Sequence, residues 1–312
     1  MKKILKIAGI ILGVVVLIIL CFVSYVQIDG IPKYETKKID LKVEVTPERV
    51  AQGFKIATME CIACHAGSDG KLSGRELTEL PKEFGKVFSR NLTSDPEKGI
   101  ANWTDGELYY LLRTGVKRDG QYLPVYMAKF PNAADEDLYS VIAWLRSDKI
   151  EKTNEEPPES EPSFLTKFLS HVAWKPLPYP EKPIQLPDTN NAVEHGKYLA
   201  NTIIHCFPCH SGDFKTLNML EPEKSGGFYG GGNKMPGLNG DLVTTRNLTF
   251  DETGIANFTE EEFIQSVRYG KKKGGGQLRM PMFPHTLLTD TECKHIYAYL
   301  KTVPKIQHKI EY

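Results

Sequence analysis

The sequence contains two copies of one long pattern, and this internal repeat restricts the fold more than any other feature. Residues 89–93 (SRNLT) recur as residues 245–249 (TRNLT), and residues 99–104 (GIANWT) recur as residues 254–259 (GIANFT). From there the two copies continue in register without a gap. A repeat at such a large spacing indicates duplicated domains rather than a solenoid of short units. A chain of 312 residues is long enough for two ordinary domains, each with its own core.

Each copy is preceded by a C-x-x-C-H motif, the attachment signature of haem c. The motifs are Cys61-Ile62-Ala63-Cys64-His65 and Cys206-Phe207-Pro208-Cys209-His210. In such a motif the two thiols add to the vinyl groups of the porphyrin, and the histidine binds the iron. We therefore predict two covalently bound haem c groups. The predicted cofactor-binding residues are Cys61, Cys64, His65, Cys206, Cys209 and His210, of which His65 and His210 are iron ligands.

Three other interpretations of a C-x-x-C pair exist. It can be a thioredoxin-like redox centre, half of a zinc site or a structural disulfide. Two copies, each followed by histidine in a chain that we expect to be exported, favour haem attachment over all three. Cys293 lies in a probable helix, and we expect it to pack as a small hydrophobic residue.

The N-terminus predicts a membrane anchor. Lys2, Lys3 and Lys6 precede residues 7–26, which contain no charged side chain and are about long enough to cross a bilayer as one helix. The apolar run is longer than that of a cleaved signal peptide, and a buried core helix is the less favoured alternative. We predict an uncleaved signal anchor over residues 1–28. The positive-inside rule places the lysines in the cytoplasm and the remainder outside the bacterial inner membrane, in the periplasm.

The predicted fold class is all-α, with the N-terminal transmembrane helix followed by two helical haem domains at 46–150 and 191–306. Residues 151–190 are rich in proline and glutamate, which predicts an extended and fairly stiff linker. Within it, residues 164–169 are expected either to form a short helix that covers a domain face or to be unstructured.

Three helices are predicted in each half. The first leads into the haem motif and spans 47–65 or 192–210. The second begins after Thr104 or Thr259, each of which is a plausible N-cap with a glutamate three positions further on. The third has an apolar stripe with helical spacing.

Methionine is a candidate sixth ligand of each iron, because a methionine ligand favours electron transfer at a raised potential. Met127 is the only methionine of the first half after the motif, and it lies the same distance before Asp135 as Met282 lies before Asp290. We therefore predict Met127 and Met282 as distal iron ligands. Met280 remains an alternative to Met282, since Met280-Pro281 is like the M-P ligand pair of class I cytochromes.

At residues 46–303 the chain resembles diheme class I c-type cytochromes made of two fused cytochrome c domains. It is most similar in its R-N-L-T and G-I-A-N-[WF]-T segments to the cytochrome subunits of membrane-bound alcohol and aldehyde dehydrogenases. The resemblance implies that both domains have the cytochrome c fold. It also implies that Arg90, Trp103, Arg246 and Phe258 lie beside haem, where the two arginines can contact propionates.

The predicted function is transfer of single electrons in the cell envelope, with no catalytic residues of its own. The expected partner is a dehydrogenase, a quinol-oxidising complex or a terminal oxidase. The alternative is a diheme enzyme, either a peroxidase or a thiosulfate dehydrogenase. Equal numbers of basic and acidic residues, 39 of each, give no support for nucleic-acid binding. The basic run 271–273 is interpreted either as a solvated face or as a docking surface for an acidic redox partner.

Overall fold

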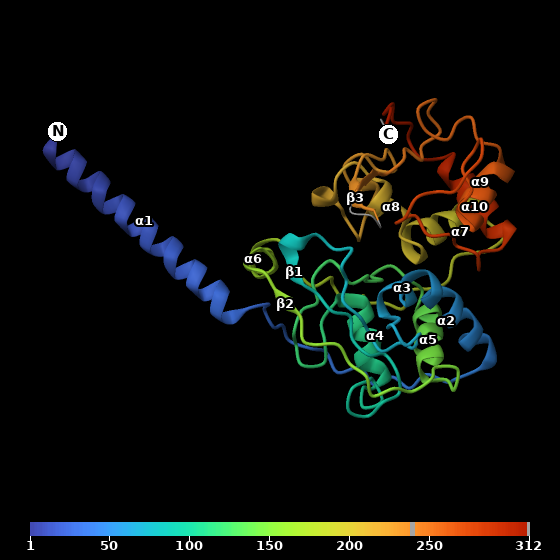
Figure 1. Cartoon of the computed structure of the whole chain (residues 1–312), viewed down its shortest axis with the longest axis horizontal. Helices are drawn as coiled ribbons and strands as arrows, with labels where there is room; N and C mark the ends of the chain where they lie inside the picture. Colours follow the sequence, from blue (N-terminus) through green and yellow to red (C-terminus); the bar gives the residue numbers. More distant parts are fainter. Residues whose placement is uncertain (238–240, 311–312) are drawn as a thin grey trace.

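The computed structural model describes residues 1–237 and 241–310. The helix α1 (Lys2–Asp29) stands away from a body formed by the rest of the chain (Figure 1). It is the one helix in the described residues that is long and apolar enough to cross a membrane, and its apolar window is not buried against the body.

The body is mostly helical, with four short strands among the described residues. The helices of its first half are α2 (Pro47–Glu60), α3 (Ile62–His65), α4 (Asp105–Thr114) and α5 (Asp135–Arg146). Those of its second half are α7 (Ala192–Tyr198), α8 (Cys206–His210), α9 (Glu260–Tyr269) and α10 (Asp290–Leu300). Short helical turns are η1 (Lys82–Phe84), η3 (Phe214–Thr216) and η4 (Pro222–Lys224), and η2 (Leu199–Ile203) is a π-helical turn. Helices therefore dominate, as predicted.

The strands form two small antiparallel ribbons that the all-α prediction did not include. The first pairs β1 (Gly85–Lys86) with β2 (Glu161–Pro162), and the second pairs β3 (Lys234–Pro236) with β4 (Leu242–Thr244). In the first ribbon Gly85 is opposite Pro162, so the segment between the two halves is attached to the first half.

The predicted starts of the second helix in each half are confirmed. Thr104 and Thr259 each accept a hydrogen bond from the backbone N–H three residues on, and Glu107 and Glu262 each accept one from the threonine N–H. These capping boxes satisfy backbone donors that the first helical turn leaves unpaired. The helices predicted to lead into the motifs are interrupted. In the second half the π-helical turn η2 and a left-handed residue, His205 (φ 50°), separate α7 from α8.

One close helix crossing supports each half. α2 packs on α5 where Gly53 faces the Ser140 carbonyl, and a Cβ at Gly53 would lie 1.9 Å from that oxygen. α7 packs on α10 in the same way, and a Cβ at Gly196 would lie 1.9 Å from the His295 carbonyl oxygen. Both crossings need a residue without a side chain, because any larger residue would push the backbones apart.

We expect Gly196→Ala to lower the free energy of unfolding by about 1–3 kcal/mol, since overpacking a close helix crossing forces backbone shifts. Chemical denaturation followed by circular dichroism measures this change. The exposed substitution Lys197→Ala on the same helix is the control and should change stability by less than about 0.5 kcal/mol. Equal effects of the two substitutions would contradict the role given to the crossing.

The two halves pack into one body rather than hanging from a free linker. Their buried residues form one continuous hydrophobic cluster. The Lys55 ammonium lies 2.5 Å from the Glu292 carboxylate. The Tyr198 hydroxyl accepts a 2.9 Å hydrogen bond from the Ala134 N–H and donates one to the Asp137 carboxylate. A charged pair, a partly buried tyrosine and a shared core therefore hold the first half against the second.

The segment between the halves follows the surface of the first half and contains a helix, α6 (Phe164–Val172). The backbone N–H of Leu177 donates to the Thr114 carbonyl at 3.0 Å, and the N–H of Asp135 donates to the Ile184 carbonyl at 2.9 Å. Of the two alternatives for residues 164–169, the short helix is therefore correct.

Candidate functional site

The two C-x-x-C-H motifs lie on short helices beside the boundary between the halves (Figure 1). Cys61 separates α2 from α3, and Cys64 and His65 follow on α3. The second motif is α8 itself. All six cysteines are free, so the thiols of both motifs remain available for covalent attachment. Cys293, predicted to pack in the core, is fully buried in α10.

The histidine of each motif is oriented by the same contact. Nδ1 of His65 lies 2.8 Å from the Arg90 carbonyl oxygen, and Nδ1 of His210 lies 2.8 Å from the Arg246 carbonyl oxygen. A carbonyl can only accept, so Nδ1 carries the proton and Nε2 keeps its lone pair. Burial lowers the pKa of both imidazoles and favours this neutral form. Metal-binding histidines are oriented by this kind of contact.

The R-N-L-T loops supply these carbonyls, and their asparagines make the loops rigid. The Asn91 amide oxygen accepts 2.7 Å hydrogen bonds from the N–H and the hydroxyl of Thr93. Asn247 and Thr249 make the same pair of bonds in the second half, at 2.9 and 2.7 Å. The side-chain amide N–H of each asparagine donates hydrogen bonds to backbone carbonyls of the segment that follows the last helix of its half. These four side chains are buried, so the loop has little freedom to move the carbonyl.

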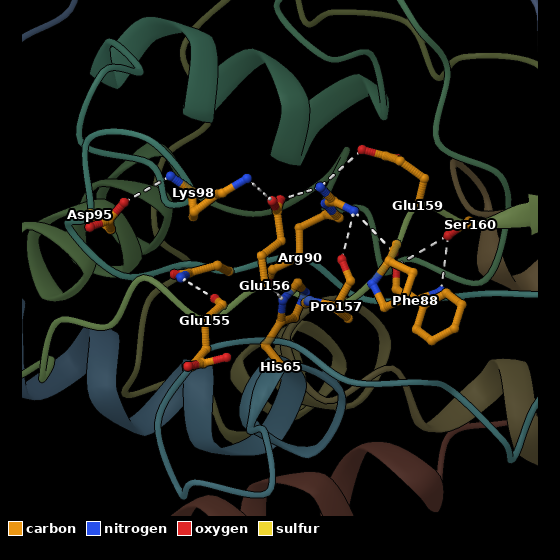
Figure 2. A network of polar contacts seen from close by, with 12 residues as sticks. His65, Phe88, Arg90, Asp95, Lys98, Glu155, Glu156, Pro157, Glu159 and Ser160 are labelled. Atoms are coloured by element: carbon orange, nitrogen blue, oxygen red, sulfur yellow. Dashed lines mark hydrogen bonds and ion pairs between the residues drawn. The ribbon is translucent and has the colours of Figure 1, made fainter.

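The Arg90 guanidinium, predicted to lie beside haem, contacts the segment between the halves (Figure 2). It pairs with the Glu156 carboxylate, lies 3.0 Å from the Glu159 carboxylate and donates to the Pro158 carbonyl at 3.2 Å. A propionate contact by Arg90 would have to share the guanidinium with these two carboxylates. The backbone carbonyl of this residue, not its side chain, is what the structure brings to the motif.

The two aromatic residues predicted beside haem have matching surroundings. Trp103 and Phe258 are partly buried and pack against the hydrophobic cluster. The guanidinium of Arg118 lies 5.1 Å from the Trp103 ring centre, and the ammonium of Lys273 lies 5.3 Å from that of Phe258. Lys273 also pairs with Glu262 at 2.9 Å, so this lysine of the basic run has partners within the chain.

The predicted distal residues Met127 and Met282 occupy equivalent places in two loops of the same shape. The N–H of Met127 lies 3.3 Å from the Pro124 carbonyl oxygen, and that of Met282 lies 3.2 Å from the Arg279 carbonyl oxygen. Each loop is pinned to the preceding helix by matching backbone hydrogen bonds on both sides of the methionine. The equivalence inferred from the repeat is therefore present in the backbone, and ligation by these sulfurs stays a prediction.

The two distal loops differ in two residues that the sequence did not single out, the buried Lys129 and the half-buried His285. Lys129 donates to the carbonyls of Pro124 and Met127 at 2.8 and 3.1 Å, and burial lowers its pKa to about 7. In the second loop burial, with a smaller contribution from nearby His210, lowers the pKa of His285 to about 4. The two sites are thus duplicated in backbone but not in the polarity of their surroundings.

The motifs meet across the boundary through the residues that precede them. Nδ1 of His205 lies 3.1 Å from the Glu60 carboxylate, and the two side chains are only 11% and 9% exposed. The His205 ring also contacts Phe130 of the first distal loop, with ring centres 5.0 Å apart. The two candidate sites are therefore neighbours in one interface.

These residues fit a covalently attached haem better than the rival groups. Burial raises the pKa of Cys61 and of Cys206 to about 12, whereas the reactive cysteine of a redox pair has a lowered pKa. Within the described residues no three His, Cys, Asp or Glu side chains gather as a metal site. Free, partly buried thiols beside a neutral imidazole with a free Nε2 match the donors that haem c requires.

Comparisons with known proteins agree with this fit. Residues 191–300 match the family model described as cytochrome C oxidase, cbb3-type, subunit III. The chain is 29% identical over 253 residues to a nicotinate dehydrogenase subunit of Pseudomonas putida, covering 80% of this chain and 19% of that protein. It is 24% identical to the cytochrome c subunit of the quinone-dependent alcohol dehydrogenase of Gluconobacter oxydans, covering 82% and 55%. It is 27% identical to a diheme cytochrome c-type protein of Cereibacter sphaeroides, covering 79% and 83%.

The chain spans only 19% and 55% of the two dehydrogenase relatives just described, and 83% of the diheme protein. The predicted resemblance to c-type cytochromes is confirmed, since residues 191–300 match a cytochrome family model and the homologues include cytochrome c subunits of dehydrogenases. A cytochrome c domain implies covalently bound haem c.

Proposed function

We propose that this chain, whose residues 191–300 are a cytochrome c domain, is a membrane-anchored diheme cytochrome that transfers single electrons. The observation that carries the proposal is the duplicated orientation of the motif histidines. His65 and His210 each direct a free Nε2 away from a carbonyl that a rigid loop holds in place. The same construction in both halves supports two haem domains, at 46–150 and 191–306.

We assign the following roles to the residues of the two sites. The four motif cysteines attach the two haem groups, His65 and His210 bind the irons, and Met127 and Met282 complete the coordination. When bound, haem c supplies an iron that cycles between ferrous and ferric states and so carries one electron. The protein keeps each imidazole neutral and in one orientation, and the packed interface keeps the two sites adjacent.

The proposed partner is a dehydrogenase, because several homologues are named as cytochrome subunits of dehydrogenases. A quinol-oxidising complex or a terminal oxidase is the alternative donor or acceptor in a respiratory chain. We place α1 across the bacterial inner membrane with its lysines in the cytoplasm and the haem domains in the periplasm. A diheme peroxidase or thiosulfate dehydrogenase would need an open distal position, and equivalent methionines in both distal loops favour the electron carrier.

The test of this function is isolation of the tagged chain from gently solubilised native membranes, followed by identification of the proteins bound to it. We expect a dehydrogenase to co-purify. Addition of its substrate should then reduce the haem irons of the complex by two electrons per chain, which the visible absorption spectrum measures. Reduction of peroxide or oxidation of thiosulfate by the isolated chain, without a redox partner, would instead identify an enzyme.

The choice between Met282 and Met280 can be made by substitution. We expect Met282→Leu to lower the midpoint potential of one haem by more than about 59 mV, a tenfold change in the one-electron equilibrium. The physical reason is that a methionine ligand raises the potential. Potentiometric titration of the visible spectrum measures the shift. Met280→Leu is the matched control, and a larger shift in that variant would assign the ligand to Met280.

A further inference from the structure

Helix α6 exposes its apolar side chains and buries its small polar ones. Thr166 and Ser170 are fully buried, with the Thr166 hydroxyl donating to the Phe84 carbonyl at 2.9 Å. Phe164, Leu165 and Val172 are 41%, 41% and 50% exposed. At 3.6 residues per turn the apolar residues lie on one side of the helix and the two polar ones lie on the opposite side. A helix on a water-facing surface has the reverse pattern, so this outer face is suited to an apolar surrounding.

Helix α6 lies beside the C-terminal end of α1 (Figure 1). The rings of Phe22 and Phe168 are 6.0 Å apart, and those of Tyr25 and His171 are 5.2 Å apart. Nε2 of His171 lies 3.1 Å from the Gly30 carbonyl oxygen, where α1 has ended. The Phe22–Phe168 contact therefore joins the apolar surface of the anchor to α6, and the polar contacts of His171 with Gly30 and Asp29 lie at the end of α1.

The position of this contact along α1 corresponds to the boundary of a bilayer. Phe22 lies four residues before Val26, the last residue of the segment predicted to cross the membrane, which is about 6 Å along a helix. Amphipathic helices that lie on a membrane place their apolar faces about 5–10 Å into the boundary between headgroups and acyl chains. Tyr25 contacts His171 at this end of the anchor, and Trp174 follows the end of α6; such aromatic residues are enriched at the membrane boundary.

The chain after α1 has little freedom to move α6 away from this level. The N–H of Tyr34 donates to the Gly120 carbonyl at 2.8 Å, and the N–H of Tyr122 donates to the Pro32 carbonyl at 3.2 Å. The first half of the body is thus attached to the anchor within a few residues of its end. α6 is in turn attached to that half through the Phe84 carbonyl.

We propose that the outer face of α6 lies in the lipid of the membrane that α1 crosses, and that it orients the haem-bearing body on the bilayer surface. This inference rests on the anchoring part of the proposed function. A lipid surface is favoured over a protein partner because α6 contacts the apolar surface of α1, which in a bilayer is surrounded by lipid.

The test uses the full haem-loaded chain in phosphatidylcholine vesicles that contain a lipid with a photoreactive diazirine in its acyl chain. After illumination, the peptides that carry lipid adducts are identified by mass spectrometry. We expect adducts on α1 and also on peptides covering residues 164–172. Adducts on α1 without adducts on α6 would overturn this inference and leave the anchor intact. Absence of adducts on α1 would instead show that the anchoring part of the proposed function fails.

A pair of variants separates lipid contact from chance labelling. Leu165→Glu places a charge on the outer face at a side chain that is 41% exposed, and we expect a several-fold loss of adducts on α6. Leu186→Glu is the matched control, because Leu186 is 49% exposed and lies outside α6. Unchanged labelling of α6 in Leu165→Glu would contradict the proposal.

Discussion

We expect a chain in which Cys206 and Cys209 are both replaced by serine to carry one covalently bound haem instead of two. Covalent attachment depends on the two thiols of a motif, which form the bonds to the vinyl groups, and serine cannot replace them. His210 would still be oriented by the Arg246 carbonyl, so any haem that remained at this site would be removable by denaturation. The pyridine haemochrome spectrum of the denatured chain, divided by protein concentration, measures the change.

The reciprocal variant and one further cysteine provide the controls. Cys61→Ser with Cys64→Ser should also leave one covalent haem, because the two motifs have the same local structure. Cys21→Ser should leave both, since Cys21 is exposed on α1 and belongs to no motif. Two covalent haem groups in either double variant would contradict the assignment of that motif.

The second large effect is expected at Arg113, whose side chain is fully buried behind the first distal loop. Its guanidinium donates to the carbonyls of Phe130 and Ala133 at 2.9 and 2.5 Å, and it pairs with the Asp135 carboxylate at 2.6 Å. We expect Arg113→Ala to lower the free energy of unfolding by about 3–5 kcal/mol, because it leaves buried carbonyls without a donor and leaves the Asp135 carboxylate with the Tyr109 hydroxyl but without a charged partner. The measurement is chemical denaturation of the haem-loaded chain followed by circular dichroism.

The repeat provides a matched comparison for Arg113. Arg268 pairs with Asp290 at the equivalent place, but these side chains are 20% and 63% exposed, against 0% and 16% for Arg113 and Asp135. Water compensates the loss of an exposed pair, so Arg268→Ala should cost only about 0–1 kcal/mol. Similar losses in the two variants would show that burial does not set the strength of this contact.

Features that depend on local sequence were predictable. The threonine and glutamate of each capping box lie within one turn, so Thr104 and Thr259 could be identified as helix starts from spacing alone. The equivalence of Met127 and Met282 followed from an ungapped repeat, because an ungapped register places equivalent residues in equivalent backbone. Helix dominance followed from the periodicity of the apolar residues.

Features that depend on contacts distant in sequence were not predictable. The sequence pointed to the side chain of Arg90, whereas the structure brings the backbone carbonyl of that residue to His65. Every residue has such a carbonyl, so residue type cannot reveal which one makes the contact. The pairing of Arg90 with Glu156 and of Lys55 with Glu292 joins charges that have many possible partners along the chain. For the same reason the segment between the halves was predicted as a linker, although it is hydrogen-bonded along the first half.

The packed boundary between the halves has a consequence for the timing of electron transfer. Glu60 and His205 connect the residues in front of the two motifs, and Lys55 and Glu292 close the same boundary. A carrier built on a flexible tether has to wait for its domains to collide, and its internal transfer then slows as the solvent becomes more viscous. Two haem groups held by a single packed body have no such encounter to wait for, so the internal step would keep its rate in a crowded and viscous cell envelope.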